Sequence, residues 1–167
     1  MLKTKTQIEN CLNKYKIKNY TILDNLSVDV NGNVYLYNWK LGEFLVQFNE
    51  VNESFSCHHN KLTSLINGSP RIVLGDFYCY DNRLTFLKGS PKIVHGSFDC
   101  SYNNLTSLKG SPKYVGGYFW CDNNNLTSLD GSPEQVGINF YCNDNQLKSL
   151  EGAPSRVGND FIVHGNP

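Results

Sequence analysis

The stretch that decides the fold is Val115–Gln135, VGGYFWCDNNNLTSLDGSPEQ, because most of the chain after residue 50 is this stretch rewritten. Complete copies begin at Val51, Val73, Val94, Val115 and Val136, and a shortened copy begins at Val157. The period is 21 residues, except that the first copy holds one extra residue between Leu65 and Gly68. A fixed period in the twenties that contains F-x-C-x-x-N-x-L-x-x-L is typical of a leucine-rich-repeat solenoid.

Each copy predicts one right-handed coil, with a parallel β-sheet on the concave face and little or no helix on the convex side. Alternation within the strand places two apolar columns inside. They are Val34, Phe55, Phe77, Phe98, Phe119, Phe140 and Phe161, and Leu36, Cys57, Cys79, Cys100, Cys121, Cys142 and Val163. Two leucine columns follow, Leu62, Leu84, Leu105, Leu126 and Leu147, and then Leu65, Leu87, Leu108, Leu129 and Leu150. Seven strands are therefore expected side by side, about 4.8 Å apart.

The rest of each copy is a bend and a return segment. An asparagine column (Asn60, Asn82, Asn103, Asn124, Asn145 and Asn166) falls where the strand turns. Its side chains are expected to bond backbone groups that the bend leaves unpaired. The return segment, x-G-S-P-x-x, is too short and too rich in Gly and Pro for a helix. We expect extended chain or a single turn there.

The sequence divides into residues 1–25, a capping helix with a lead-in, and residues 26–167, the solenoid. Residues 6–17 place Ile8, Cys11, Leu12 and Tyr15 at helical spacing. Thr6, followed three residues later by Glu9, is expected to cap this helix. The helix would cover the open first coil, since terminal repeats need a cap.

Residues 25–38 are the degenerate opening coil. Val28 and Val30 lead into Asn31-Gly32, a dipeptide typical of a two-residue β-hairpin. Moving this segment forward by one period places Val34 on Phe55, so it also matches the start of a coil.

Composition excludes several classes of protein. Lys and Arg number 15, as do Asp and Glu, so no net field favours nucleic acid or an anionic membrane. No apolar run approaches the length of a membrane span. The N-terminus is basic but lacks the apolar core of a secretory signal, which favours a reducing cytoplasm.

The cysteines are expected to be core residues rather than a site. Leu36 and Val163 end their column, and neither can ligate a metal or form a disulfide. Parallel neighbours also hold their Cβ atoms farther apart than a disulfide favours, and there is no C-x-x-C pair. The sequence also lacks G-x-S-x-G, P-loop and H-E-x-x-H motifs. We therefore expect no enzyme activity, metal or cofactor.

The residues that alternate outward carry the functional prediction. Their columns contain six aspartates (Asp76, Asp81, Asp99, Asp122, Asp144 and Asp160) and no Lys or Arg. His58 should project outward beside Tyr37 and Tyr80. Exposed aromatic side chains on a rigid sheet are common anchors of binding energy, although cross-strand contacts alone also explain such residues. The candidate partner-binding residues are Tyr35, Tyr37, Tyr78, Tyr80, Asp99, Tyr118, Trp120, Asp122 and Tyr141.

The basic residues of the repeats fall elsewhere. Lys61 and Arg83 follow the asparagine, and the bend and return segments hold Arg71, Lys88, Lys92, Lys109, Lys113, Lys148 and Arg156. The coil is thus predicted to have an acidic, aromatic strand face and a basic flank. Such a face should avoid nucleic acid and prefer a basic or amide-rich partner.

The repeat at residues 105–129, LTSLKGSPKYVGGYFWCDNNNLTSL, resembles the leucine-rich repeats of small proteins encoded by tailed bacteriophages and some of their bacterial hosts. The resemblance covers residues 26–167, and YTILDNLSVDVNGNVYLYN is similar to the family's lead-in. Bacterial effector ubiquitin ligases have more distantly similar repeats, but no ligase domain follows here. The resemblance implies a protein-binding module, for example a phage-encoded inhibitor of a host or anti-phage defence protein.

Two other functions stay open at this point. The same face could bind nucleotides or sugars as a small-ligand sponge, or the protein could be a structural or assembly component of a phage particle. The sequence stops at His164–Pro167 inside a coil, so self-association through an unpaired C-terminal edge is a further expectation.

Overall fold

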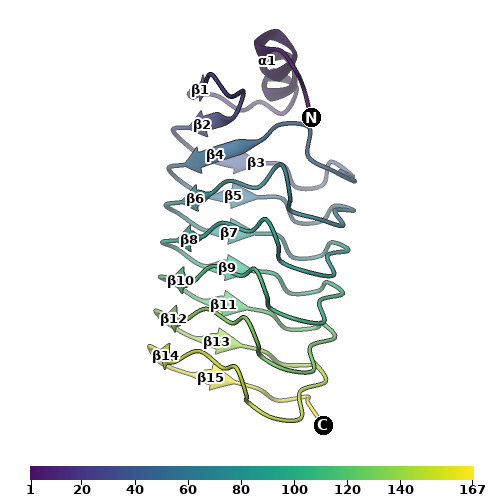
Figure 1. Ribbon diagram of the computed structural model, residues 1–167, viewed down its shortest axis with the longest axis vertical. Helices are drawn as coiled ribbons and strands as arrows, with labels where there is room; N and C mark the ends of the chain where they lie inside the picture. Colours follow the sequence, from purple (N-terminus) through teal and green to yellow (C-terminus); the bar gives the residue numbers. More distant parts are fainter.

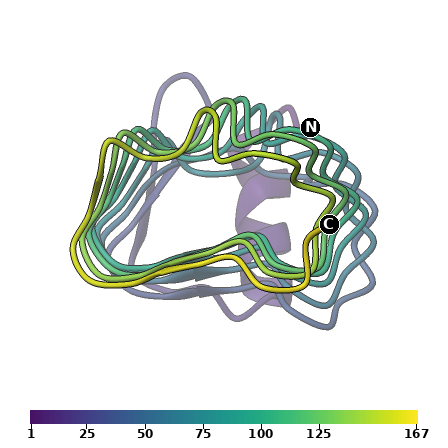
Figure 2. The same ribbon diagram turned by 90° about the horizontal axis from the view of Figure 1, so that it is seen from below.

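Each copy of the repeat folds into one flattened coil, and about six coils stack into a parallel β-solenoid in the computed structural model, which describes residues 1–167 (Figures 1 and 2). The predicted repeat solenoid is confirmed at this level. Viewed along the column, successive coils lie nearly over one another (Figure 2). Each coil contributes one short strand to each of two sheets.

The first sheet, called here the Phe sheet, is the predicted stack of seven strands. It consists of β3 (Val34–Tyr35), β5 (Phe55–Ser56), β7 (Phe77–Tyr78), β9 (Phe98–Asp99), β11 (Phe119–Trp120), β13 (Phe140–Tyr141) and β15 (Phe161–Ile162). All its pairings are parallel and follow the repeat period, so that Phe119 lies between Phe98 and Phe140.

The second sheet, called here the Val sheet, occupies the return side of the coils. It consists of β1 (Tyr20–Ile22), β2 (Val28–Val30), β4 (Phe48–Val51), β6 (Ile72–Val73), β8 (Ile93–Val94), β10 (Tyr114–Val115), β12 (Gln135–Val136) and β14 (Arg156–Val157). The return segment was expected to be extended chain or a single turn, and both occur: a turn at Lys88–Gly89, for example, precedes strand β8. Its pairing into a continuous second sheet was not expected, and it arises because a Val recurs in register in every coil and is buried in all but the last.

The core lies between the two sheets and runs the length of the column. Successive phenylalanine rings stack with centroids 5.0–5.5 Å apart, as in Phe77–Phe98 at 5.2 Å. The predicted inner columns are buried except at the C-terminal end of the column, where Phe161 and Val163 are half-buried and Leu150 is exposed. Leu150 was placed inside and is 51% exposed, because it lies in the last coil and has no further coil against it.

The asparagine column bonds the backbone as predicted. The Nδ2 group of Asn103 donates to the carbonyl oxygens of Cys100 (3.2 Å) and Ser101 (3.1 Å) in its own coil. It also donates to Cys79 O in the preceding coil (3.1 Å), and its Oδ1 accepts from Leu84 N (2.9 Å). Each asparagine therefore ties two coils together where the strand ends.

The residue before each asparagine turns the chain with a positive φ. Its φ is between 49° and 53° in five coils, at His59, Asp81, Tyr102, Asn123 and Asp144. L-residues adopt this left-handed conformation at a cost, and Asn and Asp tolerate it best. The backbone conformation at this bend is thus the same in these coils, while the residue type at the position varies.

Helix α1 (Lys5–Lys14) covers the first coil at the N-terminal end of the column (Figure 1). Ile8 and Leu12 are buried as predicted, but the predicted cap is wrong. Thr4 caps the helix by accepting a hydrogen bond from Gln7 N (3.2 Å), because Thr6 already lies within the first helical turn. Helix α1 is the only helix, and with ten residues it is too short to span a membrane.

The predicted hairpin at Asn31-Gly32 is also wrong. These residues carry the chain from β2 in the Val sheet to β3 in the Phe sheet. The antiparallel partner of β2 is β1, with Tyr20 opposite Val30. Strand β3 pairs with β5 and not with β2, and the N–H of Val34 donates to Ser54 O of the next coil (2.9 Å). Strands β2 and β3 cannot pair because they cover opposite sides of the same core.

Candidate functional site

The outward face of the Phe sheet carries two groups of aromatic rings. The first, called the N-terminal aromatic cluster, contains Tyr35, Tyr37, His58, Tyr78 and Tyr80. The His58 ring lies between two tyrosine rings, with its centroid 4.9 Å from that of Tyr37 and 4.4 Å from that of Tyr80. Both pairs are nearly parallel, at 7° and 8°. The predicted outward placement of His58 beside these tyrosines is confirmed.

The C-terminal aromatic cluster consists of Tyr118, Trp120 and Tyr141. The Trp120 ring stacks on Tyr118 (4.9 Å, 22°) and on Tyr141 (5.8 Å, 16°). The three rings come from adjacent coils on one face and form a half-buried aromatic platform.

Asp99 lies on the coil between the two clusters, and Asp122 lies in the coil of Tyr118 and Trp120. Asp99 accepts hydrogen bonds from the N–H (2.9 Å) and hydroxyl (2.5 Å) of Ser101, and Asp122 accepts from Asn143 N (2.9 Å). Burial raises the pKa of both carboxyl groups above its usual value, and their mutual repulsion adds to the shift at Asp99. The face thus combines two aromatic clusters with the carboxyl groups of Asp99 and Asp122.

The nine predicted residues therefore share one face, but they do not form one continuous cluster. Four tyrosines gather near β3, β5 and β7, and the Tyr118–Trp120–Tyr141 group lies two coils further on. Tyr35 and Tyr37 are 51% and 42% exposed, whereas the other seven are half-buried.

The predicted set omits two residues that shape this face. The His58 ring lies between those of Tyr37 and Tyr80. Because the three residues occupy equivalent positions in successive coils, the repeat alignment could have indicated that His58 belongs to the set. Asp76 accepts a hydrogen bond from the Tyr78 hydroxyl (2.8 Å), and the spacing of two residues on one strand face could have indicated that pair. Burial, with this bond, raises the pKa of Tyr78, so its hydroxyl stays protonated.

The cysteine column is part of the core, as expected. All six cysteines are free and buried. Burial raises the pKa of the column thiols, to about 12 at Cys142, so these groups are not thiolates at neutral pH. Cys100 and Cys121 donate to the carbonyl oxygens of Trp120 (3.3 Å) and Tyr141 (3.2 Å) in the next coil.

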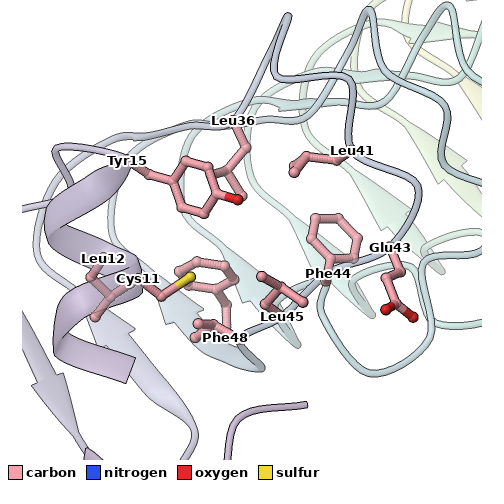
Figure 3. Close-up of a pocket in the computed structure, with 10 residues that line it drawn as sticks. Cys11, Leu12, Tyr15, Leu36, Leu41, Glu43, Phe44, Leu45 and Phe48 are labelled. Carbon is pink, nitrogen blue, oxygen red and sulfur yellow. The ribbon is translucent and has the colours of Figure 1, made fainter. Parts of the chain in front are cut away.

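An apolar seam joins α1 to the first coil (Figure 3). Cys11, Leu12 and Tyr15 of the N-terminal segment face Phe44 and Phe48 there. The cavity left between them measures about 10 Å³, roughly the room for one water molecule and far less than a ligand needs. This seam therefore packs the helix on the coil and is no ligand site.

Comparison of the chain with known proteins finds no match among protein-family models, curated proteins or solved structures. No group of three or more His, Cys, Asp or Glu side chains is placed to hold a metal ion. The aromatic and acidic face is therefore the feature of this molecule that bears on its function.

Proposed function

We propose that this chain is a non-enzymatic protein-binding module that presents the outward face of the Phe sheet to its partner. The observation that carries the proposal is the pair of stacked aromatic clusters, with Asp99 between them and Asp122 beside Trp120 in the same coil. Aromatic side chains supply large contact areas and lose little conformational freedom on binding.

The rigidity of the face supports this proposal. The Trp120 ring is already held between Tyr118 and Tyr141, so little ordering remains to be done when a partner docks. Backbone ladders to the neighbouring coils fix the strands beneath these rings, as in Cys121 N to Tyr141 O (2.9 Å). Preorganisation of this kind lowers the cost of association.

The charge of the face indicates the class of partner. Its outward columns hold six aspartates and no Lys or Arg. Arginine suits such a surface, because its guanidinium group stacks on aromatic rings and pairs with carboxylates. We therefore propose a protein partner that offers arginine, lysine or amide side chains, rather than nucleic acid.

Two finer assignments belong to the same proposal. The leucine columns and the asparagine ladder support placing the coil among leucine-rich repeats. The resemblance of residues 26–167 to phage repeat proteins supports an inhibitor of a host or defence protein, acting in the host cytoplasm.

Affinity capture from bacterial lysate, with wild-type and variant proteins as bait, tests the proposal. The variant Trp120→Ala/Tyr141→Ala should reduce recovery of a specific partner at least about tenfold, because it removes the C-terminal platform. The matched control is Phe86→Ala/Tyr114→Ala, which removes two aromatic side chains that are 40% and 43% exposed outside the two clusters. Equal recovery by both variants and the wild type would refute the proposed face.

A further inference from the structure

The first and second G-S-P corners border a hollow that breaks the regularity of the stack. Residues 66–71 of one coil and residues 88–92 of the next provide most of its lining, together with Gln47. It is open to solvent and has a volume of about 280 Å³. The extra residue of the first copy lies here, and Asn67 takes a φ of 63°. The hollow therefore forms where a longer coil meets one of standard length.

The hollow is strongly basic. Arg71, Lys88 and Lys92 line it, and no Asp or Glu does. None of the three takes part in a salt bridge. Further along the same edge, by contrast, Lys113 pairs with Glu134 across coils (3.3 Å). Three uncompensated cations in one concave site favour an anion.

Two serine hydroxyls in the lining lack partners. Ser69 Oγ and Ser90 Oγ are buried and make no hydrogen bond. Ser69 as a whole is only 5% exposed, so bulk water does not satisfy its hydroxyl group. The equivalent serines of later coils are satisfied: Ser111 donates to Gly131 O, and Ser132 donates to Leu129 O (2.7 Å). A buried hydroxyl without a partner costs roughly 1–3 kcal/mol, so the two orphans point to an absent acceptor.

From these observations we propose that the hollow binds a tetrahedral oxyanion, namely a phosphate or sulfate group that is free or at the end of a small molecule. Its anionic oxygen atoms accept hydrogen bonds, which matches the donors present. The Arg71 guanidinium suits a two-point contact with such a group, and Lys88 and Lys92 supply further charge. The site is separate from the aromatic face, so it does not depend on the proposed function.

An NMR titration of the full chain with inorganic phosphate at constant ionic strength tests the site. Saturable shifts are expected for the backbone amides of Ser69, Gly89 and Ser90. The variant Lys88→Gln/Lys92→Gln should weaken binding by about tenfold or more, since charge-assisted hydrogen bonds carry it. The control Lys61→Gln/Arg83→Gln loses the same charge outside the hollow and should bind within about twofold of the wild type.

Ser69→Ala separates binding from folding. Removal of an unpartnered hydroxyl should leave the midpoint of urea unfolding unchanged or higher, whereas phosphate affinity should fall. A parallel titration with glycerol 3-phosphate distinguishes the sources: tighter binding than inorganic phosphate indicates a terminal phosphate ester, and equal binding indicates the free anion. Shifts that stay linear with concentration, or equal affinities in the wild type and Lys88→Gln/Lys92→Gln, would overturn the site.

Discussion

The asparagine at the end of each Phe-sheet strand is the polar residue that contributes most to the coil. Asn103 makes four hydrogen bonds to backbone groups, and two of them reach the preceding coil. Its side chain is 7% exposed, so water cannot replace these partners. No other residue type offers two donors and an acceptor at this length.

Replacing this side chain should leave several backbone groups unpaired. Asn103→Ala is expected to lower the free energy of unfolding by about 2–4 kcal/mol, and Asn103→Asp should cost more, because a carboxylate would face three carbonyl oxygens. Urea denaturation measures both. The neighbouring Asn104 is exposed, so Asn104→Ala should change stability by less than about 0.5 kcal/mol. Similar losses at positions 103 and 104 would contradict this account.

At the scale of elements, helix α1 closes the apolar end of the column. Leu12 is fully buried against the first coil, and the ring of Tyr15, just beyond the helix, meets that of Trp39 edge to face at 4.8 Å. Without the helix, Leu36 and Phe48 would lose their cover (Figure 3). The helix is therefore part of the core and more than an N-terminal extension.

Truncation of the buried helix residue tests this role. Leu12→Ala should lower the free energy of unfolding by about 2–5 kcal/mol, through lost burial and the cavity that remains. Thermal or urea unfolding, followed by circular dichroism, measures the change. Glu9→Ala alters an exposed position of the same helix and serves as the control, with an expected change within about 0.5 kcal/mol. A cap that merely rests on the coil would tolerate both substitutions equally.

The strands could be predicted from the sequence where an apolar pattern recurs every 21 residues, and not where that pattern is absent or degenerate. Phe119 and Cys121 recur at one spacing, so their inward positions and the strand between them followed directly. The Val sheet was missed because each regular coil buries a single Val there, whereas the Phe sheet shows the alternating apolar pair F-x-C. The opening coil was misread because Asn31-Gly32 matches a hairpin turn. In the structure β2 and β3 bury their apolar side chains on opposite sides of the core, and each pairs within its own sheet.

The candidate sites were predictable only in part, for a related reason. The outward columns placed Trp120 and Tyr141 on one face, because strand alternation fixes that face. Sequence alone could not give the stacking of His58 between two tyrosines, which depends on side-chain rotamers. The basic hollow also escaped notice, since it depends on how one extra residue near Asn67 displaces a corner.

At the scale of the whole molecule, the buried thiols couple stability to alkaline pH. Burial holds the pKa of Cys79, Cys100 and Cys121 well above the ordinary value of 9.0. In the unfolded chain these groups ionise near that value, whereas in the folded chain they keep their protons. Their contribution to stability is therefore complete below pH 9 and is lost as pH rises above it.

The free energy of unfolding should thus fall steeply between about pH 9 and pH 10.5, with each buried thiol adding up to about 1.4 kcal/mol per pH unit. Urea titrations at several pH values measure this slope. In Cys100→Val the slope should decrease by the contribution of one thiol, because one ionisable group is removed. The variant should still fold, since Val163 already occupies the equivalent position in the last coil. Stability that does not change over this range would show that the thiols ionise equally in both states.

The common register of the two sheets has a consequence for length. Each coil meets its neighbours through the same pairings, so that Val115 lies against Val94 and Val136 just as Phe119 lies against Phe98 and Phe140. A duplicated copy of one repeat would find its partners already in place above and below. Insertion or deletion of one repeat should therefore change the distance between two surface features along the column in steps of about 4.8 Å.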